Sequence, residues 1–184
     1  PGSAVTSLAS TTALKLVSDV RVDDASLGVY SHRIDDTWLV GGASNAGCRV
    51  LRAFDFDDDE LAKLSSRLHV DEKPRNAAGV YPLVDKGERF PVNDPDKAPV
   101  LPEDTDDRLH LLNLLLLGIA DVEATGYRAL ASLGATDLAS VKTAGGGAKN
   151  DQWRRIRERM LGVPVRQAAN TDAAFGAAVL ALRR

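Results

Sequence analysis

The sequence has few aromatic side chains, and few of the cysteine and histidine side chains on which disulfide-rich and metal-binding proteins depend. It contains one cysteine, Cys48, three histidines and only 5% aromatic residues. A single cysteine excludes an internal disulfide framework and fits a reducing compartment. Because no CxxC or Cys/His pattern surrounds Cys48, we expect a buried structural thiol there. The histidines are scattered without ligand spacing, so they predict no metal site.

Long hydrophobic runs and a strong charge of one sign are also missing. The longest apolar run, Leu114 to Ala120, is far too short to cross a bilayer, and no signal peptide is visible. The formal net charge of −3 gives no general attraction to nucleic acid or acidic membranes. With 184 residues and 44% hydrophobic content, the chain can form one globular domain with a full core. Because it begins PGSAVTSLAS, without Met and directly in strand-like sequence, we expect it to be cut from a longer protein.

The two commonest nucleotide-binding fingerprints are absent. No GxGxxG motif opens a helix, and GxxxxGK[ST] fails because Cys48 follows Gly47 where a lysine is required. No Ser-His-Asp order stands out either. Any nucleotide must therefore be held by a different arrangement.

The stretch that organises the chain is VKTAGGGAKNDQWRRIRERMLG, residues 141–162. It predicts a short buried strand over 141–144 and then a turn made by Gly145, Gly146 and Gly147. Glycines let the backbone take positive φ and approach a ligand closely. This turn can equally be structural.

An amphipathic helix is expected after the glycine turn. Asn150 suits its N-cap, and Trp153, Ile156 and Met160 fall on one apolar face. Free backbone N–H groups at a helix start form an anion site, so phosphate is the natural ligand.

Two hairpins precede that stretch. Strands are expected over 4–8 and 13–17, and again over 29–34 and 37–40. The first hairpin turns through Ala9-Ser10-Thr11-Thr12, whose hydroxyls favour local turn bonding but could donate to phosphate. The second ends in GGASNAG, residues 41–47, a further glycine turn leading to a helix over 49–54.

The remaining segments predict helices and one insert. The carboxylates from Asp55 to Glu60 favour a helix start over a metal site. Residues 70–102 are proline-rich and predict an ordered excursion or a flexible insert. Longer helical patterns cover residues 106–133, where Gly134 suits the position just after the helix end, and the Ala-rich segment 171–182. Within these helices the glycines indicate close packing against a neighbour: Gly118, Gly126 and Gly176.

Four motifs, in order, resemble the carboxy-terminal domain of the FGGY carbohydrate kinases of the actin-like ATPase superfamily. They are TSLASTTALK, WLVGGASNAG, TAGGGAKNDQWRRIRERMLGVPV and NTDAAFGAAVLA, and the likeness runs from about Val5 to Leu182. GGASNAG and the insert YPLVDKGERFPVNDP look most like the D-ribulose/D-xylulose kinase-like branch of cyanobacteria and plants. The resemblance implies an α/β fold, a ribonuclease-H-like, actin-type ATPase domain with a mixed sheet flanked by helices. It also implies a cytoplasmic or plastid location.

By motif position, the resemblance implies a site for ATP with Mg²⁺. Ser10, with Thr11 beside it, resembles the hydroxyl that meets the terminal phosphates. Gly146 and Asn150 match the glycine and amide that hold the phosphate and adenosine portions. The remaining implied nucleotide-binding residues are Gly41, Gly42, Asn45, Gly145 and Gly147. No protein ligand to the metal is assigned in this chain.

Two departures from the family pattern stand out. Ala9 replaces the usual glycine before the phosphate hydroxyl, and Leu117 stands where relatives often carry an acidic residue. The family's catalytic aspartate lies in the preceding domain, and Asp19, Asp23 and Asp24 do not match it. We therefore expect no catalytic base in this chain.

The resemblance predicts the ATP-binding half of a kinase for a ketopentose, D-ribulose or D-xylulose. Residues 1–184 would be its carboxy-terminal nucleotide-binding domain. The amino-terminal substrate domain is not part of this sequence and would be the partner of this domain. The alternative is a noncatalytic nucleotide-binding or interaction module with the same fold.

Overall fold

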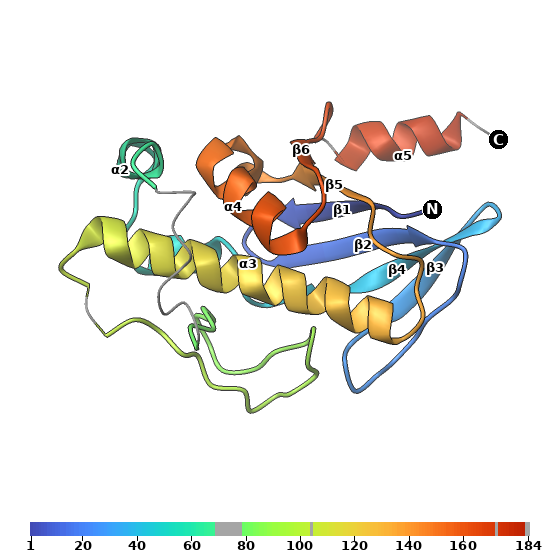
Figure 1. Ribbon diagram of the computed structural model, residues 1–184, viewed down its shortest axis with the longest axis horizontal. Coiled ribbons are helices and arrows are strands. Elements are labelled where there is room, and N and C mark those ends of the chain that lie inside the picture. The colour runs from blue at the N-terminus through green and yellow to red at the C-terminus, as the bar shows by residue number, and fades with distance from the viewer. Residues whose placement is uncertain (69–78, 104, 172, 183–184) are drawn as a thin grey trace.

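A computed structural model describes residues 1–68, 79–103, 105–171 and 173–182. Its centre is a six-stranded sheet in the order β3-β4-β2-β1-β5-β6 (Figure 1). The hairpin neighbours pair antiparallel, whereas β1 pairs with β5 and β5 with β6 in parallel. The strands are β1 (Ser3–Leu8), β2 (Thr12–Ser18), β3 (Tyr30–Ile34), β4 (Thr37–Ser44), β5 (Ser140–Ala144) and β6 (Val165–Gln167).

Helices connect the strands and pack against the sheet. The long helix α3 lies along one face of the sheet, with α4 beside it (Figure 1). The helices are α1 (Arg49–Ala53), α2 (Asp58–Ser65), α3 (Arg108–Ser132), α4 (Asp151–Leu161) and α5 (Ala173–Ala181), with one 3-10 turn, η1 (Gly146–Lys149). The expected strands and helices are confirmed within a few residues at their ends, except that η1 and β6 were not predicted.

Strand alternation explains which face of the sheet is covered. In β1, Ala4, Thr6 and Leu8 are buried, while Val5 between them is 42% exposed. Successive strand side chains point to opposite faces, so this period of two puts one face of the sheet against α3. The main core therefore lies between the sheet and α3.

Helix α3 begins where the sequence predicts. Asp107 caps it by accepting hydrogen bonds from the backbone N–H groups of Leu109 and His110 at 3.1 and 3.0 Å. Gly134 follows its end at φ 87°, a conformation that favours glycine.

The membrane argument from run length needs correction, because the whole of α3 is the relevant segment. It is 25 residues long, and its most apolar window has a mean hydropathy of 1.3, so length and composition alone would allow a span. However, 67% of that window is buried inside the protein. That burial is typical of a core helix packed on a sheet.

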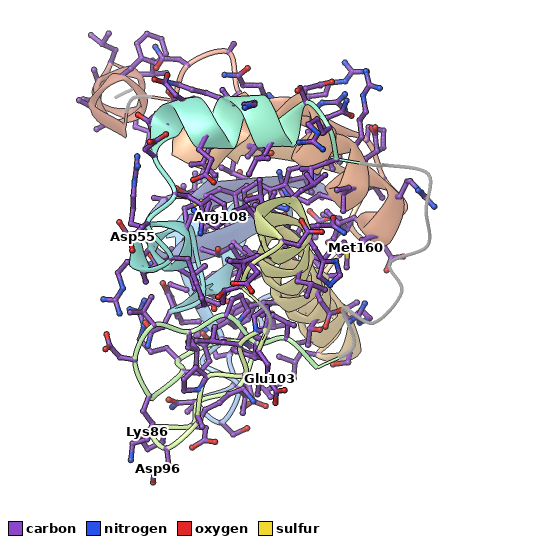
Figure 2. All side chains as sticks on the ribbon, turned by 90° about the vertical axis from the view of Figure 1, so that its left-hand side faces the viewer. Asp55, Lys86, Asp96, Glu103, Arg108 and Met160 are labelled. Atoms are coloured by element: carbon purple, nitrogen blue, oxygen red, sulfur yellow. The ribbon has the colours of Figure 1, made fainter. Side chains whose placement is uncertain are left out.

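The described part of the proline-rich insert, residues 79–103, is an ordered excursion that packs into the core. Leu83 and Phe90 are 0% exposed. Backbone bridges pair Tyr81 with Val100 and Glu88 with Asp94. At its far end Lys86 and Asp96 form an ion pair at 2.6 Å and lie together (Figure 2). Residues 70–78 of the predicted insert lie outside the described residues.

Two helix glycines pack closely, as expected, and one does not. A Cβ on Gly126 would lie 2.6 Å from the Phe90 ring, and one on Gly118 would lie 2.9 Å from Val80. Gly176 in α5 has nothing within 4 Å, and Phe175 beside it is 54% exposed. The prediction that Gly176 packs against a neighbour is therefore wrong for the described chain.

Candidate functional site

Three predicted segments meet at one edge of the sheet. Strands β1, β4 and β5 point the same way, so their carboxyl ends lie at that edge. Leu8 pairs with Thr12 and Thr12 with Ser44, while Ser7 pairs with Ala144. The Ser10 turn, Asn45 and the three-glycine turn each follow one of these strand ends. The carboxyl edge of a sheet, where connections leave for helices, is a common ligand position in α/β proteins.

The β1–β2 turn presents two hydroxyls outward. The Ala9 N–H donates to the Thr11 carbonyl at 3.1 Å, which closes the turn. Ser10 and Thr11 are exposed, and among the described residues their hydroxyls have no hydrogen-bond partner. In the described chain only Asp35 and Asp55 have positive φ outside glycine, so Ala9 sits in an ordinary backbone conformation. The methyl group of Ala9 therefore causes no backbone strain.

The start of α1 closes onto the same turn. The Cys48 N–H donates to the Ala9 carbonyl at 2.8 Å, and the Arg49 N–H donates to the Ser10 carbonyl at 3.3 Å. A Cβ on Gly47 would lie 2.6 Å from the Ser10 carbonyl oxygen, so only glycine fits there. Cys48 is only partly buried, whereas the sequence predicted a buried thiol. Burial raises the pKa of Cys48 to about 11, which keeps this thiol neutral.

The three glycines after β5 have different roles. Gly145 has φ 82°, and a Cβ there would overlap the Leu8 carbonyl oxygen. A Cβ on Gly147 would lie 2.7 Å from the Trp153 ring. Gly146 is exposed and has nothing within 4 Å of its Cβ direction. Packing therefore explains the outer two glycines, whereas Gly146 faces open space beside the sheet edge.

Helix α4 starts where the sequence predicts, but an unpredicted 3-10 turn precedes it. The 3-10 turn η1 contains Gly146 and Gly147 and precedes α4, so the glycine turn is not itself the first turn of α4. Asn150 caps α4, because its side-chain oxygen accepts from the Trp153 N–H at 2.9 Å. Its side-chain nitrogen donates to the Ser65 hydroxyl at 2.7 Å. The N-cap prediction is confirmed, but the amide already bridges α4 to α2.

The second glycine turn is also different from the prediction. Gly41 and Gly42 lie inside β4, not in a turn, and both are buried. A Cβ on Gly41 would overlap the Leu14 carbonyl, and Gly42 faces the Phe90 ring. Only glycine fits at these two positions because the neighbouring strand and the excursion come so close. These two glycines belong to the packing beneath the edge.

Asn45 reaches the edge and is held by the excursion. Its side-chain nitrogen donates to the Gly87 carbonyl at 3.0 Å, and its oxygen accepts from Arg89 Nε at 2.7 Å. The buried carboxylate of Glu88 accepts from the Asn45 N–H at 2.6 Å and from the Ser44 hydroxyl at 2.6 Å. Sequence reasoning missed Glu88 and Arg89, because nothing in the pattern links the excursion to the end of β4.

Burial and the Glu88 carboxylate raise the pKa of Tyr81, whose hydroxyl donates to Glu88 Oε2 at 2.8 Å. The phenol therefore stays protonated and serves as a fixed donor. It anchors the excursion to the carboxyl end of β4.

A pocket of about 300 Å³ is lined by the end of η1, the start of α4 and β6. Two of its cationic side chains, Lys149 and Arg166, have no hydrogen-bond or ion-pair partner within the described ranges. Arg154 donates to Asp151 at 2.8 Å, and that hydrogen bond lowers the pKa of Asp151. The lining residues are Ala148, Lys149, Asp151, Arg154, Val165, Arg166 and Gln167. Excess positive charge therefore lies beside the glycine turn.

Within the described ranges, neither a metal-binding cluster nor a candidate catalytic base is found at the edge. No group of three or more His, Cys, Asp or Glu side chains that could hold a metal occurs in the part of the chain that is described. Asp19 follows β2, which runs opposite to β1, so it lies at the other edge. Asp23 accepts from the Ser31 N–H at 2.8 Å and Asp24 from the Ser26 N–H at 2.8 Å, so both serve local turns.

Leu117, the second departure from the family pattern, is 3% exposed and packs in the core beside Leu116 and Trp153. An acidic side chain at this depth would need a buried partner.

Comparison with known sequences identifies one family. A sequence profile described as "FGGY family of carbohydrate kinases, C-terminal domain" matches residues 8–184. This range contains every residue singled out above as a nucleotide contact.

Solved structures share the fold. A xylulose kinase from Brucella ovis is 25% identical with a TM-score of 0.79, covering 99% of this chain and 39% of that one. A xylulose kinase from Bifidobacterium adolescentis is 27% identical with a TM-score of 0.75, covering 98% of this chain and 36% of that one. A Plasmodium falciparum glycerol kinase solved with ADP is 18% identical with a TM-score of 0.72, covering 96% of this chain and 37% of that one. At this identity the match shows the fold alone.

These matches confirm the predicted fold class. The chain is a mixed α/β domain of the actin-like ATPase type, and it spans less than two fifths of the length of these three structures.

Proposed function

The chain belongs to the FGGY family of carbohydrate kinases, whose C-terminal domain it forms, and from this we propose that it supplies the ATP-binding half of an ATP-dependent sugar kinase. The observation that carries the proposal is the meeting of three segments at one sheet edge. Ser10, Asn45 and Gly146 come from separate parts of the chain and follow the strand ends at that edge, and Asn150 follows Gly146 at the start of α4.

The residues present fit a polyphosphate. Gly146 is open where its neighbours are packed, and the hydroxyls of Ser10 and Thr11 face outward as donors. Lys149 and Arg166 add positive charge beside the turn. Hydroxyl and backbone donors with nearby cations are the groups that phosphoryl transfer requires, because it depends on positioning and electrostatic stabilisation.

When bound, ATP with its Mg²⁺ supplies the phosphoryl group. We assign the outer phosphates to the hydroxyls of Ser10 and Thr11 and to the backbone at Gly146. Asn150 orients the nucleoside side from its place between α2 and α4. Gly145, Gly147, Gly41 and Gly42 act through packing, and Asn45 holds the rim with Arg89. The magnesium would be held by the phosphates, and we assign no protein ligand to it among the described residues.

The general base and most sugar contacts are assigned to a preceding domain. Glu88, the buried carboxylate at the end of β4, is engaged in an internal hydrogen-bond network. A base must reach the sugar hydroxyl within hydrogen-bond distance, so it has to come from the opposite wall of a cleft. We propose a ketopentose substrate, D-ribulose or D-xylulose, which the two xylulose kinase relatives at 25% and 27% identity favour.

The proposal is tested by titrating ADP into the full-length protein and into its Gly146→Val variant by calorimetry. The open space at Gly146 lets the variant fold, but its side chain would occupy the place of a phosphate. We expect ADP affinity to fall at least about tenfold, roughly 1.4 kcal/mol.

The matched control is Gly176→Val, the other described glycine with ordinary φ and nothing within 4 Å. It should bind ADP as the wild type does. Equal affinities for the wild type and a folded Gly146→Val would refute the assignment.

The second candidate is a noncatalytic nucleotide-binding module with the same fold. An intact protein that binds ADP but shows no sugar-dependent turnover would favour it.

A further inference from the structure

A fully buried ion pair lies beneath the glycine turn. Arg157 of α4 donates to Glu123 of α3 twice, from Nε to Oε2 at 2.6 Å and from Nη2 to Oε1 at 2.7 Å. Their side chains are 1% and 0% exposed. Arg157 Nη1 also donates to the Thr143 hydroxyl at 2.9 Å, and the Thr6 hydroxyl donates to Glu123 Oε1 at 2.6 Å. The Tyr127 hydroxyl lies 2.9 Å from that of Thr6. The pair therefore joins two helices to two strands.

The strands and helix so joined are those that carry the candidate phosphate contacts. Thr6 and Thr143 are direct partners in the register of β1 and β5. Thr143 comes two residues before Gly145, and Thr6 comes four residues before Ser10. Arg157 follows the cap residue Asn150 by about two helical turns, so both lie on one side of α4. The hydrogen bond from Arg157 to Thr143 thus closes the segment that contains the whole glycine turn.

Stability alone does not explain this pair. Removing two charges from water is costly, and replacing a buried ion pair by apolar side chains of similar volume is often neutral or stabilising. The pair instead constrains geometry, because a guanidinium and a carboxylate joined by two parallel hydrogen bonds favour one relative orientation. Here that orientation sets the depth of α4 against β1 and β5.

We propose that Glu123 and Arg157 are positioning residues for the phosphate site. They hold the turn at Gly146 at a fixed distance from the hydroxyl of Ser10, so that both reach one polyphosphate. This rests on the proposed function for its ligand, but the placement of the turn can be measured without ligand.

The decisive variant is the double replacement Glu123→Leu with Arg157→Met in the full-length protein. It removes both charges together, so that neither is left buried and unpaired. We expect a thermal midpoint close to that of the wild type and an ADP affinity at least tenfold weaker. Adenosine affinity should change less than twofold, because the turn positions phosphate. Arg157→Lys keeps the charge without the two parallel hydrogen bonds. Its ADP affinity should lie between those of the wild type and the double variant.

Hydrogen exchange supplies the readout that needs no ligand. In the double variant the amides of residues 145–150 should exchange at least tenfold faster, while those of β2 and β4 keep their wild-type rates. The control is Leu130→Ala, a buried α3 position outside the network, which should lower the thermal midpoint without a selective change at the turn.

The outcomes separate the two proposals. Wild-type protein that binds no ADP, with faster turn exchange in the double variant, would refute the nucleotide site and keep the positioning role. Normal ADP affinity and unchanged turn exchange in the folded double variant would overturn the positioning role. Equal losses for ADP and adenosine would overturn it as well, because the effect would then be general.

Discussion

Lys15 of β2 is held in a costly position at the scale of a single residue. Its ammonium nitrogen is buried, has no hydrogen-bond partner among the described residues, and lies 3.7 Å from the centre of the Tyr30 ring. A cation over an aromatic face recovers part of the lost hydration. Burial nevertheless lowers the pKa of Lys15 from 10.5 to about 8. The charged form is thus disfavoured in the folded state.

This shift predicts a pH dependence of stability with a defined sign. Between about pH 8 and 10.5 the unfolded chain binds the Lys15 proton more tightly than the folded chain, so stability rises with pH across that window. We expect the free energy of unfolding of the wild type to rise relative to that of Lys15→Met from about pH 8 to 10.5. Below that window the two should run parallel. Urea unfolding of both proteins across this range measures the difference, and parallel behaviour throughout would contradict the assignment.

At the scale of elements, one aromatic ring joins three of them. Phe90 of the excursion is 0% exposed and packs against Gly42 of β4 and Gly126 of α3. Both contacts need the absence of a Cβ, so glycine at these positions is a packing requirement. The excursion is thereby locked to the sheet, and Glu88 and Arg89 beside Phe90 reach the end of β4.

We therefore expect Gly126→Ala to destabilise the protein, although alanine is the better helix former. The new methyl group would lie 2.6 Å from a ring that cannot retreat. Overpacking of this kind costs about 1–3 kcal/mol, which exceeds the gain in helix propensity of up to about 1 kcal/mol.

Gly176→Ala is the matched control, because it is also in a helix but meets nothing within 4 Å. It should leave stability unchanged or slightly raised. Urea unfolding measures the free energy of unfolding of both variants. If Gly126→Ala left it unchanged or raised it as Gly176→Ala does, Phe90 would have room to move.

At the scale of the whole molecule, the chain provides one wall of the proposed cleft. It covers 36–39% of the length of three solved relatives. The phosphate donors assigned above are present, but the base and most sugar contacts are assigned to another domain. Closure of two domains around a substrate brings the reacting groups together and excludes water.

The 184-residue chain alone should therefore not phosphorylate D-ribulose or D-xylulose, even with saturating MgATP. Joined to its preceding domain, it should show sugar-dependent turnover. A coupled ADP-release assay over a panel of pentoses and pentuloses, with both proteins in parallel, measures this. Robust sugar-dependent turnover by the purified chain alone would show that the half-enzyme interpretation is wrong.

The sequence by itself determined the features that depend on neighbouring residues. The strand and turn signals over 4–17 predicted the hairpin of β1 and β2, and the Asn150 cap followed from its place before an amphipathic run. These features could be predicted because hydrogen bonds and side-chain periods act over a few residues. The glycine turn at 145–147 was visible for the same reason.

Tertiary structure alone decided which of these residues are open at the sheet edge and which are closed in by packing. Gly41 and Gly42 look like a turn in sequence, but β2 and Phe90 close over them. Glu123 and Arg157 carry no local signal, and their contacts to Thr6 and Thr143 join residues as far as 117 positions apart. Such contacts depend on how α3, α4 and the sheet settle together. The sequence therefore predicts the parts of the site, while packing across the core decides that Gly146 remains open and its neighbours do not.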